Sequence, residues 1–324
     1  MRPDISVIIA AYNVERYIER AVSSALAQSP AIEVIAVDDR STDKTWDALL
    51  QINDPRLQRI RLTVNRGPGG ARNAGIARAS GRWIAVLDGD DAFHSERLAR
   101  LLKLAEEQKA DIVVDNLSVC RESDGATFPM FPPARLARLP LLGLADFIAG
   151  NTSLAGGYAL GYMKPVISAA FLRRRKLRYQ EDLRIGEDYF LLAEALALGA
   201  RCAVDPAEGY LYTARAGSVS HRLTGTDIQN ILANDARFVS LHKLSPAAAK
   251  AQRKRHANLQ EAYAYACLVK AIKSRDFPSA LRAAAASPCA VRHLWRPAWV
   301  RTRKIIPFLL NRKGKPEWQR LTIF

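Results

Sequence analysis

The stretch Trp83-Ile84-Ala85-Val86-Leu87-Asp88-Gly89-Asp90-Asp91 decides the fold of this chain. Its short apolar run ends abruptly in three carboxylates, a pattern typical of a buried strand that leads into a loop. Carboxylates this close repel one another, and a cation relieves that repulsion. Because Mg²⁺ and Mn²⁺ prefer oxygen ligands, the stretch predicts a metal site. The alternative is an acidic loop that caps the helix expected from Ser95.

Strands and helices alternate on both sides of this run. The pattern predicts strands at 5–11, 32–37, 57–64, 83–87 and 111–114, and helices near 15–28, 43–52, 70–80 and 95–108. Such alternation is typical of right-handed βαβ units and a mostly parallel sheet flanked by helices. We expect an α/β, Rossmann-like domain over residues 1–224, divided into halves at 1–115 and 116–224.

Composition narrows the class of protein. The chain has 324 residues, of which 49% are hydrophobic, and no apolar stretch long enough to span a membrane. Met1-Arg2-Pro3-Asp4 leads directly into the first strand without the apolar core of a signal peptide. The four cysteines are scattered without CxxC pairing, so neither a zinc site nor a disulfide framework is indicated. We therefore expect a cytoplasmic protein.

Basic charge is concentrated at the C-terminal end. Residues 225–324 hold 19 Lys and Arg against 5 Asp and Glu, whereas the whole chain has a net charge of +16. Ala-rich helical patterns occur at 262–270 and 279–286, and Trp295, Trp299 and Trp318 lie among basic residues. This composition predicts a basic helical region at 225–324 that associates with an anionic membrane surface. The alternative is a solvated tail whose aromatic residues pack on the first domain.

Polar clusters follow three of the predicted strands. Ala11-Tyr12-Asn13 follows the first, Asp38-Asp39 the second, and Asp88-Gly89-Asp90-Asp91 the fourth. Ligands bind beyond the carboxyl ends of parallel strands, so all three clusters are expected to line one crevice. An aromatic ring, a carboxylate and an acidic metal site suit a nucleoside diphosphate. Taken singly, Tyr12 could be a packing aromatic and Asp39 part of a helix cap.

These residues carry a resemblance to a known family. Residues 4–115 resemble the nucleotide-sugar half of family 2 glycosyltransferases, which have the GT-A fold; the matching segments are 7–13, 37–43, 70–75 and 87–91. Gly186-Glu187-Asp188-Tyr189 matches the position of the family's acceptor-side carboxylate. Within the family, the chain is similar to bacterial exopolysaccharide glucosyltransferases, such as those that build succinoglycan on a lipid carrier.

The resemblance implies a role for each matching residue of the nucleotide half. Tyr12 and the backbone of Ala11 contact the base, and Asp39 accepts a hydrogen bond from its imide N–H, which favours uracil. Arg72 lies beside the base or the diphosphate, and Asp88 contacts the ribose or sugar. Asp90 and Asp91 hold Mn²⁺ or Mg²⁺, directly or through water. Arg40 departs from the family, in which many members have Gly at this position.

The catalytic residues expected from the resemblance are Asp188 as general base and Glu187 as its neighbour that contacts the acceptor. Asp188 also begins a helical pattern, so it could simply stabilise a helix N-terminus. His221 lies in a Gly/Ser segment and is a candidate third metal ligand or a solvated side chain. Arg215 and Arg222 are candidates for contact with phosphate.

Together these features predict a metal-dependent, inverting hexosyltransferase. It would transfer a sugar, expected to be glucose, from a UDP-sugar to a hydroxyl of a growing, lipid-linked polysaccharide repeat unit. Its expected location is the inner face of the bacterial plasma membrane. The pI near 10.0 suggests a nucleic-acid-binding protein as an alternative, but the chain contains no recognised nucleic-acid-binding motif. A nucleotidyltransferase that uses the same acidic metal site is the third interpretation.

Overall fold

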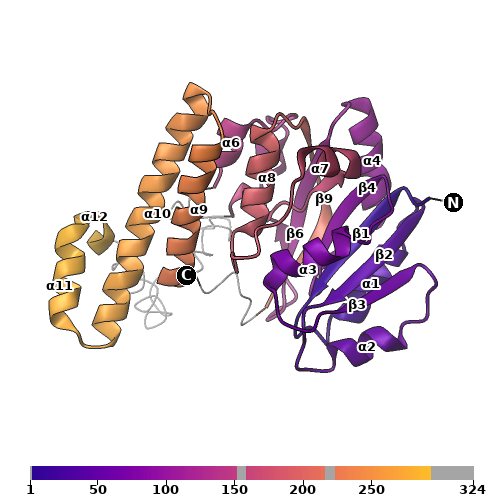
Figure 1. Cartoon of the computed structure of the whole chain (residues 1–324), viewed down its shortest axis with the longest axis horizontal. Helices are drawn as coiled ribbons and strands as arrows, with labels where there is room; N and C mark the ends of the chain where they lie inside the picture. Colours follow the sequence, from indigo (N-terminus) through magenta and orange to yellow (C-terminus); the bar gives the residue numbers. More distant parts are fainter. Residues whose placement is uncertain (1, 152–157, 216–222, 293–324) are drawn as a thin grey trace, which may run out of the picture.

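The computed structural model of the protein describes residues 2–151, 158–215 and 223–292 (Figure 1). Nine strands of these residues form one mixed sheet, in the order β3-β2-β1-β4-β8-β6-β9-β5, with β7 paired to β6. The strands are β1 (Ile5–Ala11), β2 (Ile32–Asp38), β3 (Leu57–Arg61), β4 (Trp83–Asp88), β5 (Ala92–Phe93), β6 (Ile112–Arg121), β7 (Thr127–Pro129), β8 (Val166–Ser168) and β9 (Cys202–Ala214).

The first four strands are parallel, as the sequence predicts. β6 and β9 are also parallel to each other. The short strand β8 lies between β4 and β6 and is antiparallel to both, which the sequence pattern did not indicate. The predicted α/β fold with a mostly parallel sheet is therefore confirmed, and β8 is inserted at its centre.

Helices cover both faces of the sheet. They are α1 (Ile18–Leu26), α2 (Thr45–Gln51), α3 (Gly67–Ile76), α4 (Arg97–Glu107), α5 (Pro133–Leu136), α6 (Leu144–Ala149), the 3-10 helix η1 (Leu160–Tyr162), α7 (Ala169–Arg175) and α8 (Glu187–Ala197). α3 packs on β1 and β2, and α4 packs on β6 and β9. α1 begins at Ile18 rather than Glu15, because residues 15–17 form a turn.

Two glycines let α3 approach its neighbours closely. A Cβ on Gly75 would lie 2.5 Å from the Ile8 side chain of β1, and one on Gly69 would lie 2.6 Å from the Gln180 carbonyl oxygen. Distances this short are not compatible with a larger side chain, because protein interiors are already densely packed. Gly67-Pro68-Gly69-Gly70 thus forms the first turn of α3, and its small residues let Arg72 lie against the sheet.

The C-terminal helices are α9 (Gly225–Leu241), α10 (Pro246–Lys273), α11 (Phe277–Ala286) and α12 (Pro288–Val291). Apolar residues of α9 and α10, including Phe238 and Leu259, belong to the same core as the sheet. α11 packs on the end of α10 in a separate small cluster and lies with α12 far from the sheet (Figure 1). The core therefore continues across the predicted boundary at residue 224. None of the described helices is long and apolar enough to cross a membrane.

Candidate active site

The carboxyl ends of β1, β2 and β4 meet at one edge of the sheet. Ala10 of β1 is in register with Asp88 of β4, and Ala11 is in register with Asp38 of β2. The backbone N–H of Asp39 donates to the Ala11 carbonyl (2.8 Å), and that of Gly89 donates to the Ala10 carbonyl (2.9 Å). The three polar clusters therefore lie side by side, as predicted from the strand-end rule.

The two residues expected at the base site differ in their surroundings. The Tyr12 side chain packs little, since 47% of the residue is exposed at this edge. Asp39 is buried, and its Oδ1 accepts a hydrogen bond from the backbone N–H of Arg66 (2.7 Å), while burial raises its pKa. Asp39 does not cap the next helix, because the N-cap residue of α2 is Lys44 and no side chain caps that helix. Its neighbour Asp38 accepts from the Ser41 N–H (3.1 Å) within the loop before α2.

The loops after β1 and β2 are joined by side chains. The Asn13 amide oxygen accepts from the Thr42 N–H (2.9 Å), so Asn13 connects these loops. Arg40 has a φ of +65°, a backbone conformation in which glycine is favoured. This explains why glycine suits this position in many family members, and Arg40 places a cation next to Asp39.

A ring of ion pairs, which we call the charge ring, joins α3, β4 and α8. Arg72 donates from Nη2 to Asp88 Oδ1 (2.5 Å) and from Nη1 to Asp188 Oδ1 (2.8 Å). Lys164 Nζ reaches Asp88 Oδ2 at 2.8 Å and Asp188 Oδ2 at 2.5 Å. Two cations therefore bridge the same two carboxylates from opposite oxygens. Arg72 also donates to Glu187 Oε1 (2.7 Å), which adds a third carboxylate beside the ring.

Burial and charge shift the pKa values of the ring in a consistent way. Burial raises the pKa of Asp88, but the positive charges of Lys164 and Arg72 outweigh it and hold that pKa below its ordinary value. Burial lowers the pKa of Lys164, but the charges of Asp188 and Asp88 outweigh it and raise that pKa. Glu187 behaves differently, because burial and the charge of Asp188 raise its pKa. The ring thus favours ionised Asp88 and Lys164.

Glu187 and Asp188 occupy the first turn of α8. Gly186 precedes them with a φ of +97°, a conformation that glycine adopts without steric cost. Negative side chains in the first turn are stabilised by the helix dipole. The helix-start interpretation of Asp188 is therefore correct, and it coexists with the ion pairs to Arg72 and Lys164.

Asp90 and Asp91 point to different partners. Asp90 Oδ2 accepts from Arg215 Nε (2.8 Å), whereas both oxygens of Asp91 are held by β9, through the Tyr210 hydroxyl and the Thr213 N–H (2.8 Å each). Burial and then the charge of Asp88 raise the pKa of Asp90. Burial and the charges of Asp90 and Asp88 raise the pKa of Asp91 well above its ordinary value.

This arrangement fits a divalent cation shared with a ligand. No group of three His, Cys, Asp or Glu side chains among the described residues forms a complete metal site. Asp90 lies at the carboxyl edge with a raised pKa, so a cation would relieve its repulsion with Asp88. Mg²⁺ in phosphate-binding sites commonly uses one or two carboxylates together with phosphate oxygens. His221 and Arg222 lie outside the described residues.

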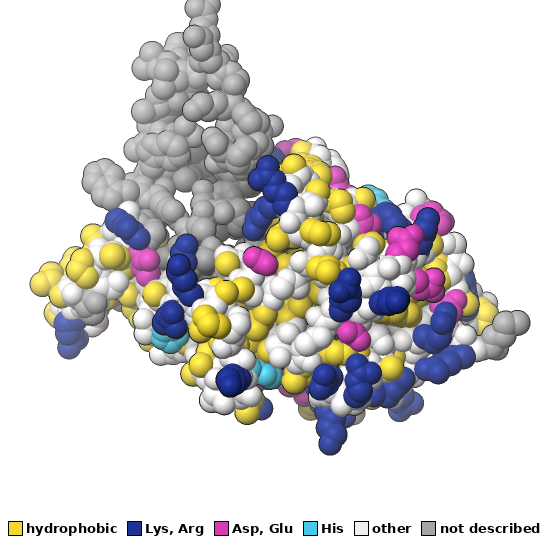
Figure 2. All heavy atoms as spheres, turned by 90° about the horizontal axis from the view of Figure 1, so that it is seen from above, with side chains coloured by type: hydrophobic (Ala, Val, Ile, Leu, Met, Phe, Trp, Pro, Cys, Tyr) yellow, Lys and Arg dark blue, Asp and Glu magenta, His cyan; other side chains and the backbone are white. Residues whose placement is uncertain are grey.

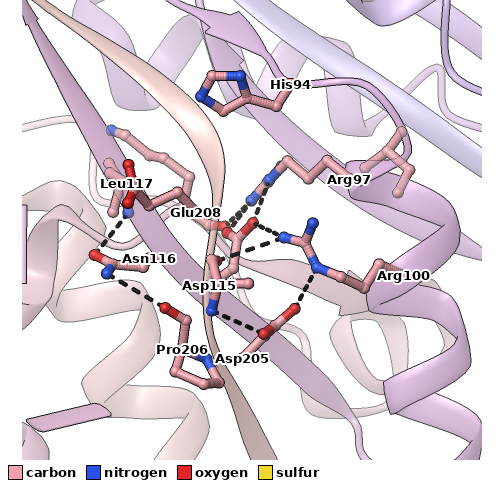
Figure 3. A network of polar contacts seen from close by, with 12 residues as sticks. His94, Arg97, Arg100, Asp115, Asn116, Leu117, Asp205, Pro206 and Glu208 are labelled. Carbon is pink, nitrogen blue, oxygen red and sulfur yellow. Dashed lines mark hydrogen bonds and ion pairs between the residues drawn. The ribbon is translucent and has the colours of Figure 1, made fainter. Parts of the chain in front are cut away.

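A second buried charge cluster lies on α4, β6 and β9, next to Lys164 of the charge ring (Figure 3). Arg97 donates from Nε and Nη2 to the two oxygens of Asp115 (2.9 and 2.8 Å), and both side chains are fully buried. Arg100 pairs with Asp205 beside them. Arg97 Nη2 also donates to the carbonyl of Lys164 (2.8 Å), which connects this cluster to the backbone of the charge ring.

Sequence reasoning missed Lys164 and the Arg97–Asp115 pair. Lys164 stands alone in a segment between η1 and β8, and no motif surrounds it. Only the long-range pairing of β8 with β4 brings it to Asp88. Arg215, in contrast, was expected to contact phosphate, and it lies at the acidic loop through its ion pair with Asp90.

Comparisons with known proteins agree with this geometry. Residues 6–170 match the sequence model described as Glycosyl transferase family 2. The chain is 46% identical to the succinoglycan biosynthesis protein ExoO of Rhizobium meliloti, over 94% of this chain and 87% of that protein. It is 42% identical, over 32% of its length and 42% of the relative, to the Escherichia coli enzyme WfaP, named UDP-Glc:alpha-D-GlcNAc-diphosphoundecaprenol beta-1,3-glucosyltransferase.

Solved structures share the fold at lower identity. The crystal structure of S. aureus TarS 1–349 in complex with UDP-GlcNAc is 19% identical, with a TM-score of 0.62 over 86% of this chain and 89% of that one. The mannosyltransferase PcManGT from Pyrobaculum calidifontis, in complex with GDP-Man and Mn²⁺, is 19% identical, with a TM-score of 0.60 over 94% and 82%. These matches decide against a nucleic-acid-binding protein, and the chain belongs to the family 2 glycosyltransferases, with the GT-A fold.

Proposed function

We propose that this glycosyltransferase transfers glucose from UDP-glucose to a hydroxyl of a growing, lipid-linked saccharide during exopolysaccharide synthesis. In this proposal the reaction inverts the anomeric centre and depends on Mn²⁺ or Mg²⁺. The relatives named above support the choice of donor, acceptor and pathway class.

The observation that carries the proposal is the charge ring. It joins Asp88, at the end of β4, to Asp188, in the first turn of α8, through Arg72 and Lys164. Asp88 lies on the strand-end side expected to hold the sugar nucleotide, and Asp188 lies on the helix expected to face the acceptor. In this proposal Asp88 is the donor-side carboxylate and Asp188 the acceptor-side one, and the cations that they share hold them close together, as a displacement between two substrates requires.

In the proposed reaction, Asp188 acts as the general base. It accepts the proton of the acceptor hydroxyl as that oxygen forms a bond to the anomeric carbon, and the bond to the UDP oxygen breaks with its electron pair. A carboxylate has about four lone-pair positions, so Asp188 can accept this hydrogen bond while it stays paired to Arg72 and Lys164. Glu187 lies beside it for contact with the acceptor.

The donor would be recognised at the strand ends. The exposed Tyr12 ring would stack on the base, next to the Ala11 backbone, and Asp39 would accept from the uracil imide N–H. Asp88 would contact the ribose or sugar. Asp90 would bind the divalent cation directly, Asp91 would hold the loop against β9, and the cation would neutralise charge on the diphosphate.

The substitution Asp188→Asn tests this mechanism. We expect transfer from UDP-glucose to a lipid-linked acceptor, with Mn²⁺ present, to fall by about 10³-fold, because Asn cannot take the proton. UDP affinity, measured by calorimetry, should stay within about twofold of the wild type, because Asp188 does not contact the nucleotide.

Asp124→Asn is the matched control. Asp124 is a half-exposed carboxylate that pairs with Arg121 and is not a member of the charge ring. The substitution should leave transfer unchanged. Retained transfer in Asp188→Asn, or loss of UDP binding in that variant, would remove Asp188 from the role of base.

We also propose that the protein associates peripherally with the inner face of the membrane. In the described part of the C-terminal region, Phe277 and Leu281 lie one turn apart on α11 and are 68% and 76% exposed. Lys273, Arg275 and Arg282 are exposed close by in the sequence. Figure 2 shows hydrophobic side chains at this end of the molecule with Lys and Arg beside them. The predicted Trp295, Trp299 and Trp318 anchors lie outside the described residues.

The double substitution Phe277→Ser with Leu281→Ser tests this association. Sedimentation with vesicles rich in anionic phosphatidylglycerol should fall by at least about tenfold, because two apolar side chains no longer enter the interface. Val64→Ser is the control, since Val64 is 60% exposed near the other end of the chain. Equal binding by the double variant and the wild type would exclude this face of α11 as the anchor.

A further inference from the structure

We propose that Lys164 is a positioning residue for the transfer reaction. It fixes the orientation of the Asp188 carboxylate beside Asp88. The inference rests on the proposed function, because it assigns Lys164 a task through the proposed base. Lys164 itself need not contact either substrate.

The geometry of the ring supports this role. Lys164 Nζ lies 2.5 Å from Asp188 Oδ2, while Arg72 Nη1 lies 2.8 Å from Asp188 Oδ1. A carboxylate held at one oxygen can rotate about its terminal bond, but a carboxylate held at both oxygens by different cations cannot. Catalytic groups need to stay within about half an ångström of their productive geometry. Lys164 therefore supplies the second of the two contacts that orient Asp188.

Lys164 also balances the charge of the ring. Asp188 and the groups around it comprise three carboxylates (Asp88, Glu187 and Asp188) and two cations (Arg72 and Lys164). Without Lys164, one arginine would face all three carboxylates, and repulsion between Asp88 and Asp188 would move their side chains apart.

Lys164 is itself firmly held. Its side chain is only 6% exposed, and its carbonyl accepts from Arg97 Nη2 (2.8 Å) in the buried cluster of α4 and β6. An ordinary surface lysine samples many rotamers, and that freedom would leave Asp188 poorly fixed. A buried stem and an anchored backbone remove that freedom before substrate binds.

The experiment compares Lys164→Met with Lys164→Arg in the full-length protein. Steady-state transfer from UDP-glucose, with Mn²⁺ and lipid-linked acceptor, gives kcat and the donor KM. Lys103→Met is the control, because Lys103 is a 78% exposed lysine on α4. Thermal unfolding and UDP binding establish that each variant is folded.

We expect Lys164→Met to lower kcat by about 100-fold, a loss typical of a small misplacement of a catalytic group, with the donor KM within about twofold. Lys164→Arg keeps the positive charge and the hydrogen-bond donors, and it should recover at least about tenfold of the lost kcat. A raised donor KM with unchanged kcat, or a kcat of Lys164→Arg as low as that of Lys164→Met, would overturn the proposal.

A double variant separates this proposal from the proposed function. If Lys164 acts through Asp188, Asp188→Asn with Lys164→Met should be no slower than Asp188→Asn alone. Additive losses would overturn the positioning role while leaving Asp188 as the base. If Asp188→Asn keeps full transfer, the proposed base fails instead, whatever Lys164→Met does.

Discussion

Two of the buried arginine–carboxylate clusters in the described part of the chain differ in their balance of charge. In the cluster of α4, β6 and β9, Arg97 and Asp115 are fully buried and share two hydrogen bonds, and Arg100 pairs with Asp205 and also lies 3.5 Å from Asp115, so that two cations face two carboxylates. In the charge ring, three carboxylates face two cations, and the carboxylates keep some solvent contact: 24% of the Asp88 side chain and 14% of Asp188 are exposed. The first cluster is closed, and the second can accept another ligand.

This difference shows that similar ion pairs can have different roles. A buried cluster with equal numbers of cations and carboxylates supports the scaffold, because removing one partner leaves an uncompensated charge in the interior. A ring with an excess of carboxylates at the carboxyl edge of the sheet can receive a proton, a hydroxyl or a cation. The two clusters also touch, since Arg97 holds the carbonyl of Lys164. The scaffold pair therefore supports the backbone that carries a member of the ring.

Asp115→Asn is the substitution with the largest expected effect on stability. It leaves the Arg97 charge buried without its partner, so the free energy of unfolding should fall by about 3–5 kcal/mol. The matching substitution in the ring, Asp188→Asn, should cost activity far more than stability. Urea unfolding of both variants, with transfer measured per folded molecule, gives the comparison.

The double substitution Arg97→Met with Asp115→Leu provides the control. It removes both charges together, and it should recover most of the lost stability, since well-packed apolar residues often replace a buried ion pair without cost. If Asp115→Asn unfolds at the same urea concentration as the wild type, the distinction between a scaffold pair and a ligand-ready ring is wrong.

The parts of this protein that could be predicted from sequence are those encoded locally. Each strand ends in its own polar cluster, so the position of Tyr12, Asp39 and Asp88 at one edge followed from alternation of strands and helices. The helix start at Asp188 also follows from its own neighbours. The family resemblance supplied the roles, which local pattern alone does not contain.

The missed parts depend on pairing over long stretches of chain. Lys164 reaches Asp88 only because β8 inserts antiparallel between β4 and β6. Asp91 follows Asp90 directly, yet its oxygens are bound by Tyr210 and Thr213, more than a hundred residues away. The sequence assigns both aspartates to the metal, and no local signal predicts that their side chains have different protein partners.

Asp90→Asn should change the free energy of unfolding less than Asp115→Asn does, and in the opposite direction. Burial and the charge of Asp88 raise the pKa of Asp90 above its ordinary value. A carboxyl whose pKa is higher in the folded protein loses stability as the pH rises from its unfolded value of about 3.9 through its folded pKa. Ionised Asp90 therefore costs stability at pH 7. Asp90→Asn should not lower the free energy of unfolding at pH 7, and it should remove this loss between acidic and neutral pH.

The same substitution should reduce Mn²⁺-dependent UDP binding by at least tenfold, or about 1.4 kcal/mol, because the proposed direct ligand is gone. Calorimetry with and without Mn²⁺ measures this effect, and urea unfolding from pH 4 to pH 7 measures the other. Asp91→Asn is the neighbouring variant: it should keep the Mn²⁺ dependence, because both Asp91 oxygens are bound to β9. If Asp90→Asn destabilises the protein as Asp115→Asn does while UDP binding keeps its Mn²⁺ dependence, then Asp90 belongs with the closed scaffold pairs, and the cation is held elsewhere.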